Sequence, residues 1–265
     1  MPDADTAAER RTPTPLTAMS VDRSLHVLNG FLGSRARMTL TELARHLEMP
    51  KSTVFRLVTQ LTESGYLERT GRHYQLSLRV FQLGNHHALC APTALREIAA
   101  PHMGGLFQHT GVTVSLAVLS GHRIVYLDRI RGPRSGPSPA IVGGRLPALT
   151  TALGKAILAY QPDAIVHRAL QHGLVRRTTH SIVAPGLMND QLATVRSTGV
   201  AYDRQESLLG LMCVAAPIMS ADEVPVAAIS LSGPVVRFKP ESVAPLAIRS
   251  AQLIASDMRR YHSEV

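Results

Sequence analysis

The chain lacks the features that mark disulfide-rich, zinc-binding, secreted and membrane proteins. It has two cysteines, Cys90 and Cys213, in different expected elements, which indicates neither a disulfide framework nor a zinc spacing. His86, His87 and Cys90 form a small cluster, for which a polar helix face is favoured over a metal site. No apolar run approaches the ~20 residues of a membrane span, and the N-terminal stretch has no hydrophobic core for a secretory signal. We therefore expect a cytoplasmic protein without a metal or a membrane partner.

Motifs of catalysis are also missing from the sequence. It has no Gly-rich phosphate loop, no nucleophile elbow and no metal-binding helix motif, and Gly143-Gly144 is too short to count as one. The sequence therefore predicts a protein that is not an enzyme and that needs no cofactor.

The charge balance is basic, and the length suits two domains. The 265 residues carry a formal net charge of +9, and residues 18–80 alone hold nine Lys or Arg against five Asp or Glu. A basic protein is attracted to polyanions, but this does not by itself indicate DNA binding. We expect a disordered tail (1–17), a DNA-binding domain (18–80), a linker helix (81–93) and a second domain (94–265).

Residues 39–76 have the pattern of a winged helix-turn-helix. Thr39 can cap a first helix, and Glu42 follows at the spacing of a capping box. Pro50 ends that helix, because proline disfavours a helical residue before itself, and a second helix is expected from Lys51 or Ser52. Its apolar residues recur at i, i+3, i+4 and i+7 and predict one buried stripe: Val54, Leu57, Val58 and Leu61.

A short hairpin is expected to follow this helix as the wing. Gly65 ends the helix, residues 66–68 and 73–76 are strand-like, and Thr70-Gly71 marks a tight turn between them. A B-DNA major groove is about 12 Å wide and admits one helix, and helix N-terminal amides attract phosphate. A small helical hairpin with a solvated polar face is the alternative, but a wing with basic residues near its tip favours DNA. The candidate DNA-binding residues are Thr39, Thr41, Lys51, Ser52, Thr53, Phe55, Arg56, Thr59, Arg69, Arg72 and His73.

Two further helices are expected around this module. The helix over 20–32 has apolar residues on one side: Val21, Leu25, Leu28 and Leu32. The helix over 76–91 connects the domains, and its expected apolar anchors are Val80, Phe81, Leu83 and Leu89. Pro92 interrupts it, and residues 94–108 form the next helix.

The second domain is expected to be mixed α/β, so that the fold class of the chain is α+β. From Gly111 the period changes to two, which predicts a hairpin of strands over 112–118 and 123–130. Residues 131–147 are rich in glycine and proline and predict a long irregular loop. The remaining expected helices are 152–160, 162–172, 185–197 and 240–262, the last with Val243, Leu246, Ala247, Leu253 and Ile254 inward, and the remaining strands are 200–203, 212–219 and 224–231. This antiparallel sheet with helices on it resembles a small-molecule sensor of the GAF type.

Several segments together resemble the IclR family of bacterial transcriptional regulators. They are SVDRSLHVLNGFL, LTELARHLEMPKSTVFRLVTQLTESGYLER and YQLSLRVFQLG in the first domain, and GGRLPALTTALGKAILAY and GVAYDRQESLLGLMCVAAPIMSADEVPVAAISLSGP in the second. The resemblance implies a homodimer, often a dimer of dimers, that binds a palindromic operator as double-stranded DNA. It also implies a repressor that binds a small effector, an organic acid or aromatic metabolite, in its C-terminal domain.

The same resemblance implies the residues of an effector pocket. They are Ala152, Leu153, Asp203, Cys213, Ser230 and Ser232, together with Leu149, which stands where the family often has a histidine. Amides at a helix start can hold a carboxylate, and Ser230 and Ser232 point the same way because they are two apart on a strand. Alternatively, the serines bond neighbouring backbone and Cys213 is an ordinary buried residue. Leu149 removes a polar group from the expected pocket rim, which favours an apolar or aromatic portion on the ligand.

Two other functions remain open at this stage. One is an effector-independent regulator or an activator whose C-terminal domain serves only oligomerisation. The other is a small-molecule enzyme carrying a nucleic-acid module, which the missing catalytic motifs disfavour.

Overall fold

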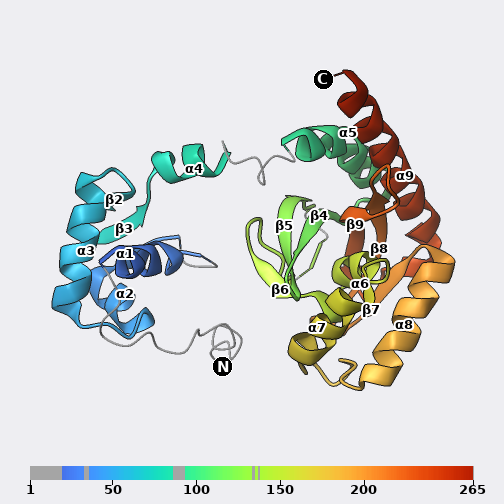
Figure 1. Cartoon of the computed structure of the whole chain (residues 1–265), viewed down its shortest axis with the longest axis horizontal. Helices are drawn as coiled ribbons and strands as arrows, with labels where there is room; N and C mark the ends of the chain where they lie inside the picture. The colour runs from blue at the N-terminus through green and yellow to red at the C-terminus, as the bar shows by residue number, and fades with distance from the viewer. Residues whose placement is uncertain (1–19, 33–35, 86–92, 133–134, 137, 265) are drawn as a thin grey trace. The chain divides into compact units, whose positions relative to one another are not determined.

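The chain forms two compact units that divide between His86 and His87. A computed structural model describes residues 20–32, 36–85, 93–132, 135–136 and 138–264 (Figure 1). The expected tail over 1–17 and the cluster of His86, His87 and Cys90 lie outside these residues. In the described ranges, no helix is long and apolar enough to cross a membrane, and no group of His, Cys, Asp and Glu could hold a metal ion.

The first unit is a winged helix-turn-helix, as the sequence predicts. Its elements are α1 (Ser20–Asn29), β1 (Met38–Thr39), α2 (Leu40–His46), α3 (Lys51–Glu63), β2 (Leu67–Thr70), β3 (His73–Leu76) and α4 (Leu78–Asn85). The predicted capping box begins α2, because the Thr39 hydroxyl accepts from the Glu42 amide at 3.3 Å and the Glu42 carboxylate accepts from the Thr39 amide at 2.8 Å.

The predicted apolar stripe of helix α3 packs in the core of this unit. Val54, Leu57, Val58 and Leu61 are all buried there. Strands β2 and β3 form an antiparallel hairpin that closes from Thr70 to His73, and β1 adds to the other edge of β3. Gly71 in the turn has φ +61°, a conformation that side chains with a Cβ rarely adopt. The hairpin therefore projects its tip beyond the core as the wing.

The apolar residues expected on α1 and α4 do not pack in the core as a set. Helix α1 ends at Asn29, and its fully buried residue is Val27, whereas Val21 and Leu25 are exposed. On α4, Phe81 and Leu83 are exposed, so they are not the internal anchors that the sequence suggested, and Leu89 lies outside the described residues. Periodicity identifies an apolar side of a helix, but it does not tell which surface covers that side.

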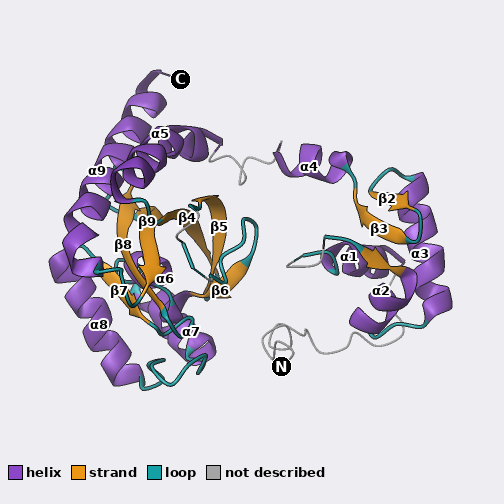
Figure 2. Ribbon diagram, turned by 180° about the vertical axis from the view of Figure 1, so that it is seen from behind, coloured by secondary structure: helices purple, strands orange, loops and turns teal. Residues whose placement is uncertain are grey.

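The second unit is an antiparallel sheet with helices on both faces (Figure 2). Its elements are α5 (Thr93–Thr110), β4 (Thr113–Ser120), β5 (Arg123–Ile130), β6 (Arg145–Pro147), the 3₁₀ turn η1 (Ala148–Thr150), α6 (Ala152–Leu158), α7 (Asp163–Gly173), α8 (Pro185–Thr198), β7 (Ala201–Arg204), β8 (Leu211–Met219), β9 (Pro225–Pro234) and α9 (Pro240–Glu264). The strand order is β6-β5-β4-β9-β8-β7. This confirms the expected mixed domain of helices and antiparallel strands.

Alternation along the strands divides the interior of this unit into two cores. Val114 and Leu116 of β4 face α5 and α9, whereas Ala117 faces α6, α7 and α8. The second face also carries the polar residues Thr113 and Ser115, because successive side chains of a strand point to opposite sides. Polar groups are therefore buried against α6 on this face.

Two details of the second unit differ from the sequence prediction. Residues 145–147, expected in the long loop, form β6 and pair with β5. Leu253 of α9 was expected to point inward, but it is exposed, while Ile254 next to it is fully buried. Leu253 therefore adds an apolar side chain to the side of α9 that does not pack in the core.

Candidate DNA-binding and effector-binding sites

The exposed face of α3 carries the residues predicted to enter the major groove. Lys51, Ser52, Phe55 and Arg56 are exposed, and Thr53 and Thr59 are half-buried. The Thr59 hydroxyl donates to the carbonyl of Phe55 at 2.9 Å, so it is engaged within the helix. Arg56 forms no hydrogen bond or ion pair with the described residues. Its guanidinium group therefore stays available to an external partner.

The wing exposes Arg69, Arg72 and His73, as predicted. The Arg69 Nε donates to the carbonyl of Gly71 at 3.0 Å, and its guanidinium group lies 5.8 Å from the ring centre of Tyr74. These contacts hold the Arg69 side chain along the hairpin, where it remains exposed. The arrangement suits contacts with phosphates, which require positive charge and little directional precision.

The two threonines predicted at the start of α2 have different surroundings. The Thr39 hydroxyl also donates to the Glu42 carboxylate at 2.8 Å, so the capping box occupies most of its hydrogen-bonding capacity. Thr41 is exposed, and its hydroxyl is the better placed of the two to meet a phosphate.

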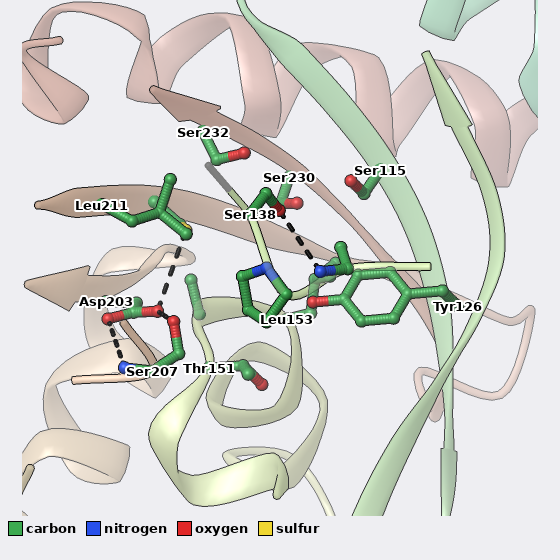
Figure 3. A pocket seen from close by; sticks show the side chains of 14 residues that line it. Ser115, Tyr126, Ser138, Thr151, Leu153, Asp203, Ser207, Leu211, Ser230 and Ser232 are labelled. Carbon is green, nitrogen blue, oxygen red and sulfur yellow. Dashed lines mark hydrogen bonds between the residues drawn. The ribbon is translucent and has the colours of Figure 1, made fainter. Parts of the chain in front are cut away.

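A pocket opens on the polar face of the sheet, between the strands and the start of α6 (Figure 3). It holds about 330 Å³ of empty space, part of which is open to solvent at its mouth. Its lining residues are mostly small or hydroxyl-bearing: Ser115, Tyr126, Ser138, Pro139, Ala140, Thr151, Ala152, Leu153, Asp203, Ser207, Leu211, Cys213, Ser230 and Ser232.

Strand register explains why the predicted polar residues meet at this pocket. Ser232 pairs with Cys213 on β8, and Cys213 pairs with Asp203 on β7, so these three side chains form one row across the sheet. In the next row, Ser230 pairs with Ser115 of β4. Neither Ser230 nor Ser232 bonds to neighbouring backbone in the described part of the chain. This weakens the alternative that the two serines only satisfy the backbone.

The start of α6 forms the opposite wall. Thr151 caps the helix, and its hydroxyl accepts from the amide of Gly154 at 3.1 Å. A Cβ on Gly154 would lie 2.2 Å from the carbonyl oxygen of Ala148, so the helix can approach η1 this closely only with glycine there. Ala152 and Leu153, the first two residues of α6, line the pocket.

Leu149 does not line the pocket. Its side chain is fully buried in the apolar core and faces Gly173 of α7. The predicted place of Leu149 on the pocket rim is therefore wrong, and Leu149 gives no support to an apolar portion on the ligand. Successive side chains of a 3₁₀ turn point in different directions around its axis, and the sequence does not tell which of them points into the core.

Asp203 is buried at one end of the pocket, and the protein itself occupies much of its carboxylate. Its Oδ1 accepts from the amide of Glu206 at 2.7 Å, its Oδ2 accepts from the hydroxyl of Ser207, and the Cys213 thiol lies 3.8 Å from Oδ2. Burial raises the pKa of Asp203 to about 6, against the opposing effects of the Ser207 hydrogen bond and of Lys155. Burial and Asp203 also raise the pKa of the Cys213 thiol. Asp203, near the end of β7, therefore also holds the turn over 205–207 besides lining the pocket.

Sequence reasoning missed a buried ion pair behind this pocket. The Nζ of Lys155 donates to Oε1 of Glu206 at 2.6 Å and to Oε1 of Gln191 at 2.9 Å. This ion pair joins α6 to the turn after β7 that contains Glu206. It therefore holds the wall formed by α6 in place against the wall formed by β7 and that turn. Lys155 stands in the same helix start that the resemblance singled out, but its partner lies 51 residues away, and no local pattern indicates it.

Sequence reasoning also missed pocket residues outside the predicted set. Tyr126 of β5 faces the pocket with its hydroxyl (Figure 3), and burial raises its pKa. Ser138 and Pro139 come from the long loop, whose length was the one signal that it contributes to a site.

The winged first unit and the pocketed second unit define a two-domain DNA-binding transcriptional regulator. Residues 20–71 match the IclR helix-turn-helix domain, and residues 87–257 match the bacterial transcriptional regulator IclR C-terminal domain. The chain therefore belongs to the IclR family of transcriptional regulators, which are DNA-binding proteins and not enzymes.

Individual relatives agree with this assignment over nearly the whole chain. The transcriptional repressor IclR of Escherichia coli strain K12 is 32% identical over 248 residues, covering 89% of this chain and 90% of the relative. Among solved structures, an IclR homologue from Microbacterium hydrocarbonoxydans in complex with 4-hydroxybenzoate superposes with a TM-score of 0.84 at 26% identity, covering 91% of this chain and 100% of that one. The Thermotoga maritima IclR superposes with a TM-score of 0.73 at 26% identity, covering 90% and 98%.

Proposed function

We propose that this regulator is a repressor whose affinity for its operator is controlled by a small organic acid or aromatic metabolite. The observation that carries the proposal is the hydroxyl-lined pocket of the second unit, in which predicted residues from three strands and the start of α6 come together. The protein acts in the cytoplasm, where operator DNA and metabolites are both present. A homologue crystallised with 4-hydroxybenzoate supports an effector of this class.

Operator recognition in this proposal uses α3 and the wing. Arg56 reads a base edge from the exposed face of α3, because a guanidinium group without an internal partner can donate two hydrogen bonds to guanine. Arg69 and Arg72 neutralise flanking phosphates. Lys51 and Ser52, at the start of α3, place backbone amides against the phosphate backbone.

The protein acts as a homodimer, or as a dimer of dimers, in the same proposal. Exposed apolar residues on α1 and α4, and Leu32 just after α1, support contact with a second copy: Val21, Leu25, Leu32, Leu78, Phe81 and Leu83. Several large apolar side chains exposed on one helix, such as Phe81 and Leu83 of α4, favour an interaction site. A two-fold dimer presents two α3 helices, which suits a palindromic operator.

The DNA part of the proposal is tested with Arg56→Ala and the charge-matched control Arg249→Ala. Both variants lose one exposed arginine and therefore the same charge. Arg249 lies on α9 in the other unit, away from the residues proposed to bind DNA. We expect Arg56→Ala to weaken operator binding by about 1–3 kcal/mol and random DNA binding little, because only the operator offers the correct base. Fluorescence anisotropy with both DNAs measures this. Equal losses on the two DNAs would show that Arg56 contacts only phosphate.

A further inference from the structure

One arginine beside the pocket has donors that nothing in the described structure satisfies. Arg129, the penultimate residue of β5, donates from Nη1 to the carbonyl of Ala140. Its Nε and Nη2 atoms are buried, and neither has a hydrogen-bond partner. Buried polar groups of folded proteins are nearly always paired, so two unpaired donors on one side chain point to a missing acceptor.

The strand register places Arg129 on the pocket face of the sheet. Arg129 pairs with Ser115 of β4, and Ser115 pairs with Ser230 of β9. Directly paired residues point to the same face, and Ser115 and Ser230 both line the pocket. Ala140, to which Arg129 donates, also lines the pocket. Arg129 therefore lies on the pocket face of the sheet, one strand beyond the lining residue Ser115.

A second unsatisfied group lies on the same face. The hydroxyl of Thr113 is buried without a partner. Thr113 is two residues before Ser115 on β4 and pairs with Ser232, another lining residue. Thr113 and Arg129 thus carry unsatisfied polar atoms on the neighbouring strands β4 and β5, whereas Oε2 of Glu206, also without a partner, lies at the Asp203 end.

The missing acceptor is best matched by a carboxylate. Nε and Nη2 share one edge of the planar guanidinium group, and this edge donates two parallel hydrogen bonds to a carboxylate. No acidic side chain of the described residues forms an ion pair with Arg129, and the sequence from Arg131 to Gly144 contains none. Burial and the nearby Arg131 lower the pKa of Arg129. A bound anion would raise this pKa, because it stabilises the charged guanidinium group.

We propose that Arg129 binds the carboxylate of the effector side-on, so that the effector is an organic acid with its anionic end towards β5. The other end of the acid then reaches the hydroxyls and Asp203 between β7 and β9. This inference rests on the proposed effector pocket and deepens it, because it chooses Arg129 over the amides at the start of α6 as the carboxylate site. It also gives the long loop a role, since the loop residue Ala140 holds Arg129 in place.

The test compares an acid with its neutral isostere on matched variants of the full chain. The probes are 4-hydroxybenzoate and 4-hydroxybenzamide, and the variants are Arg129→Gln, Arg129→Lys and the control Arg249→Gln. Titration calorimetry should show that Arg129→Gln weakens binding of the acid by at least about tenfold, because a bidentate charged pair is lost. Arg129→Lys should lose part of the affinity, while Arg249→Gln should bind like the parent. The amide should bind the parent and Arg129→Gln equally weakly.

The outcomes separate this inference from the proposed function. If Arg129→Gln binds the acid as the parent does, the carboxylate lies elsewhere, and only the role of Arg129 is overturned. If the parent binds neither probe, a library of metabolite acids and neutral compounds is screened by the melting temperature of the full chain. Stabilisation by acids that is lost in Arg129→Gln supports the inference, and stabilisation confined to neutral compounds overturns it alone. No stabilising compound at all would contradict the effector pocket itself, and the inference with it.

Discussion

The buried ion pair between Lys155 and Glu206 gives the most demanding prediction about this fold. The relative exposures of the two side chains are 0% and 3%, and their charged atoms are 2.6 Å apart. Methionine in place of Lys155 has a side chain of similar length but carries no charge. The Glu206 carboxylate then stays buried without its cation, and one of its oxygens already lacks a partner. Replacing Glu206 with glutamine leaves the Lys155 ammonium with Gln191 as its other acceptor.

Each single substitution should cost about 3–5 kcal/mol, because removal of one partner leaves an uncompensated charge in the interior. The double variant should lose less than either single variant, since neither member of the pair is left as an uncompensated charge. The exposed pair of Arg204 and Glu241 is the control, with relative exposures of 57% and 54%. Its coupling energy should be about 0–1 kcal/mol, because water screens it.

Differential scanning calorimetry of the four proteins of each cycle measures these energies. For a domain of this size, the single variants at the buried pair should lower the melting temperature of the second unit by on the order of 10 °C. If the double variant is as unstable as the sum of the two single variants, Lys155 and Glu206 do not act as a pair. The account of the two pocket walls held together by this contact would then be refuted.

Two further perturbations test the wing and the buried carboxylate. Replacing Arg69 and Arg72 together with alanine should weaken binding to every DNA and reduce the slope of log affinity against log salt by about 2, and an unchanged slope would contradict the wing contact. Because the pKa of Asp203 is raised from 3.8 to about 6, the folded state keeps a proton that the unfolded state releases. The parent should therefore lose about 2 kcal/mol of stability relative to Asp203→Asn as the pH rises from 4 to 6, measured by urea unfolding, and a constant difference would contradict the raised pKa.

Local patterns predicted the elements of this protein well. The stripe on α3, the capping box at Thr39 and the two-residue turn at Gly71 are all decided by residues within a few positions of each other, and the structure confirms each. Alternation likewise identified β4, whose pairing with β5 needs only a short turn at Gly121. Such features are readable because their energies come from neighbours in sequence.

Features that depend on distant partners were not readable. The buried Lys155 has its partner at Glu206, and Arg129, with its unsatisfied edge, lies on the pocket face of β5 in register with Ser115 and Ser230. Leu149 was placed on the pocket rim by analogy, but the tight turn of η1 directs it into the core. The sequence showed that α1 and α4 each have an apolar side. It did not show whether that side packs within this chain or against a second copy, because that depends on the oligomer.

Coupling between the two sites is the central claim, and operator binding with and without a bound ligand tests it most directly. The ligand is 4-hydroxybenzoate or the acid that stabilises the full chain most in the melting screen. For the parent, saturating ligand should change operator affinity by about 5–150-fold, because both partners bias one conformational equilibrium. Ser230→Ala, compared with its own ligand-free state, should show no such change. An operator affinity of the parent that stays constant while the ligand is bound would contradict effector control and would leave the second unit a role in oligomerisation only.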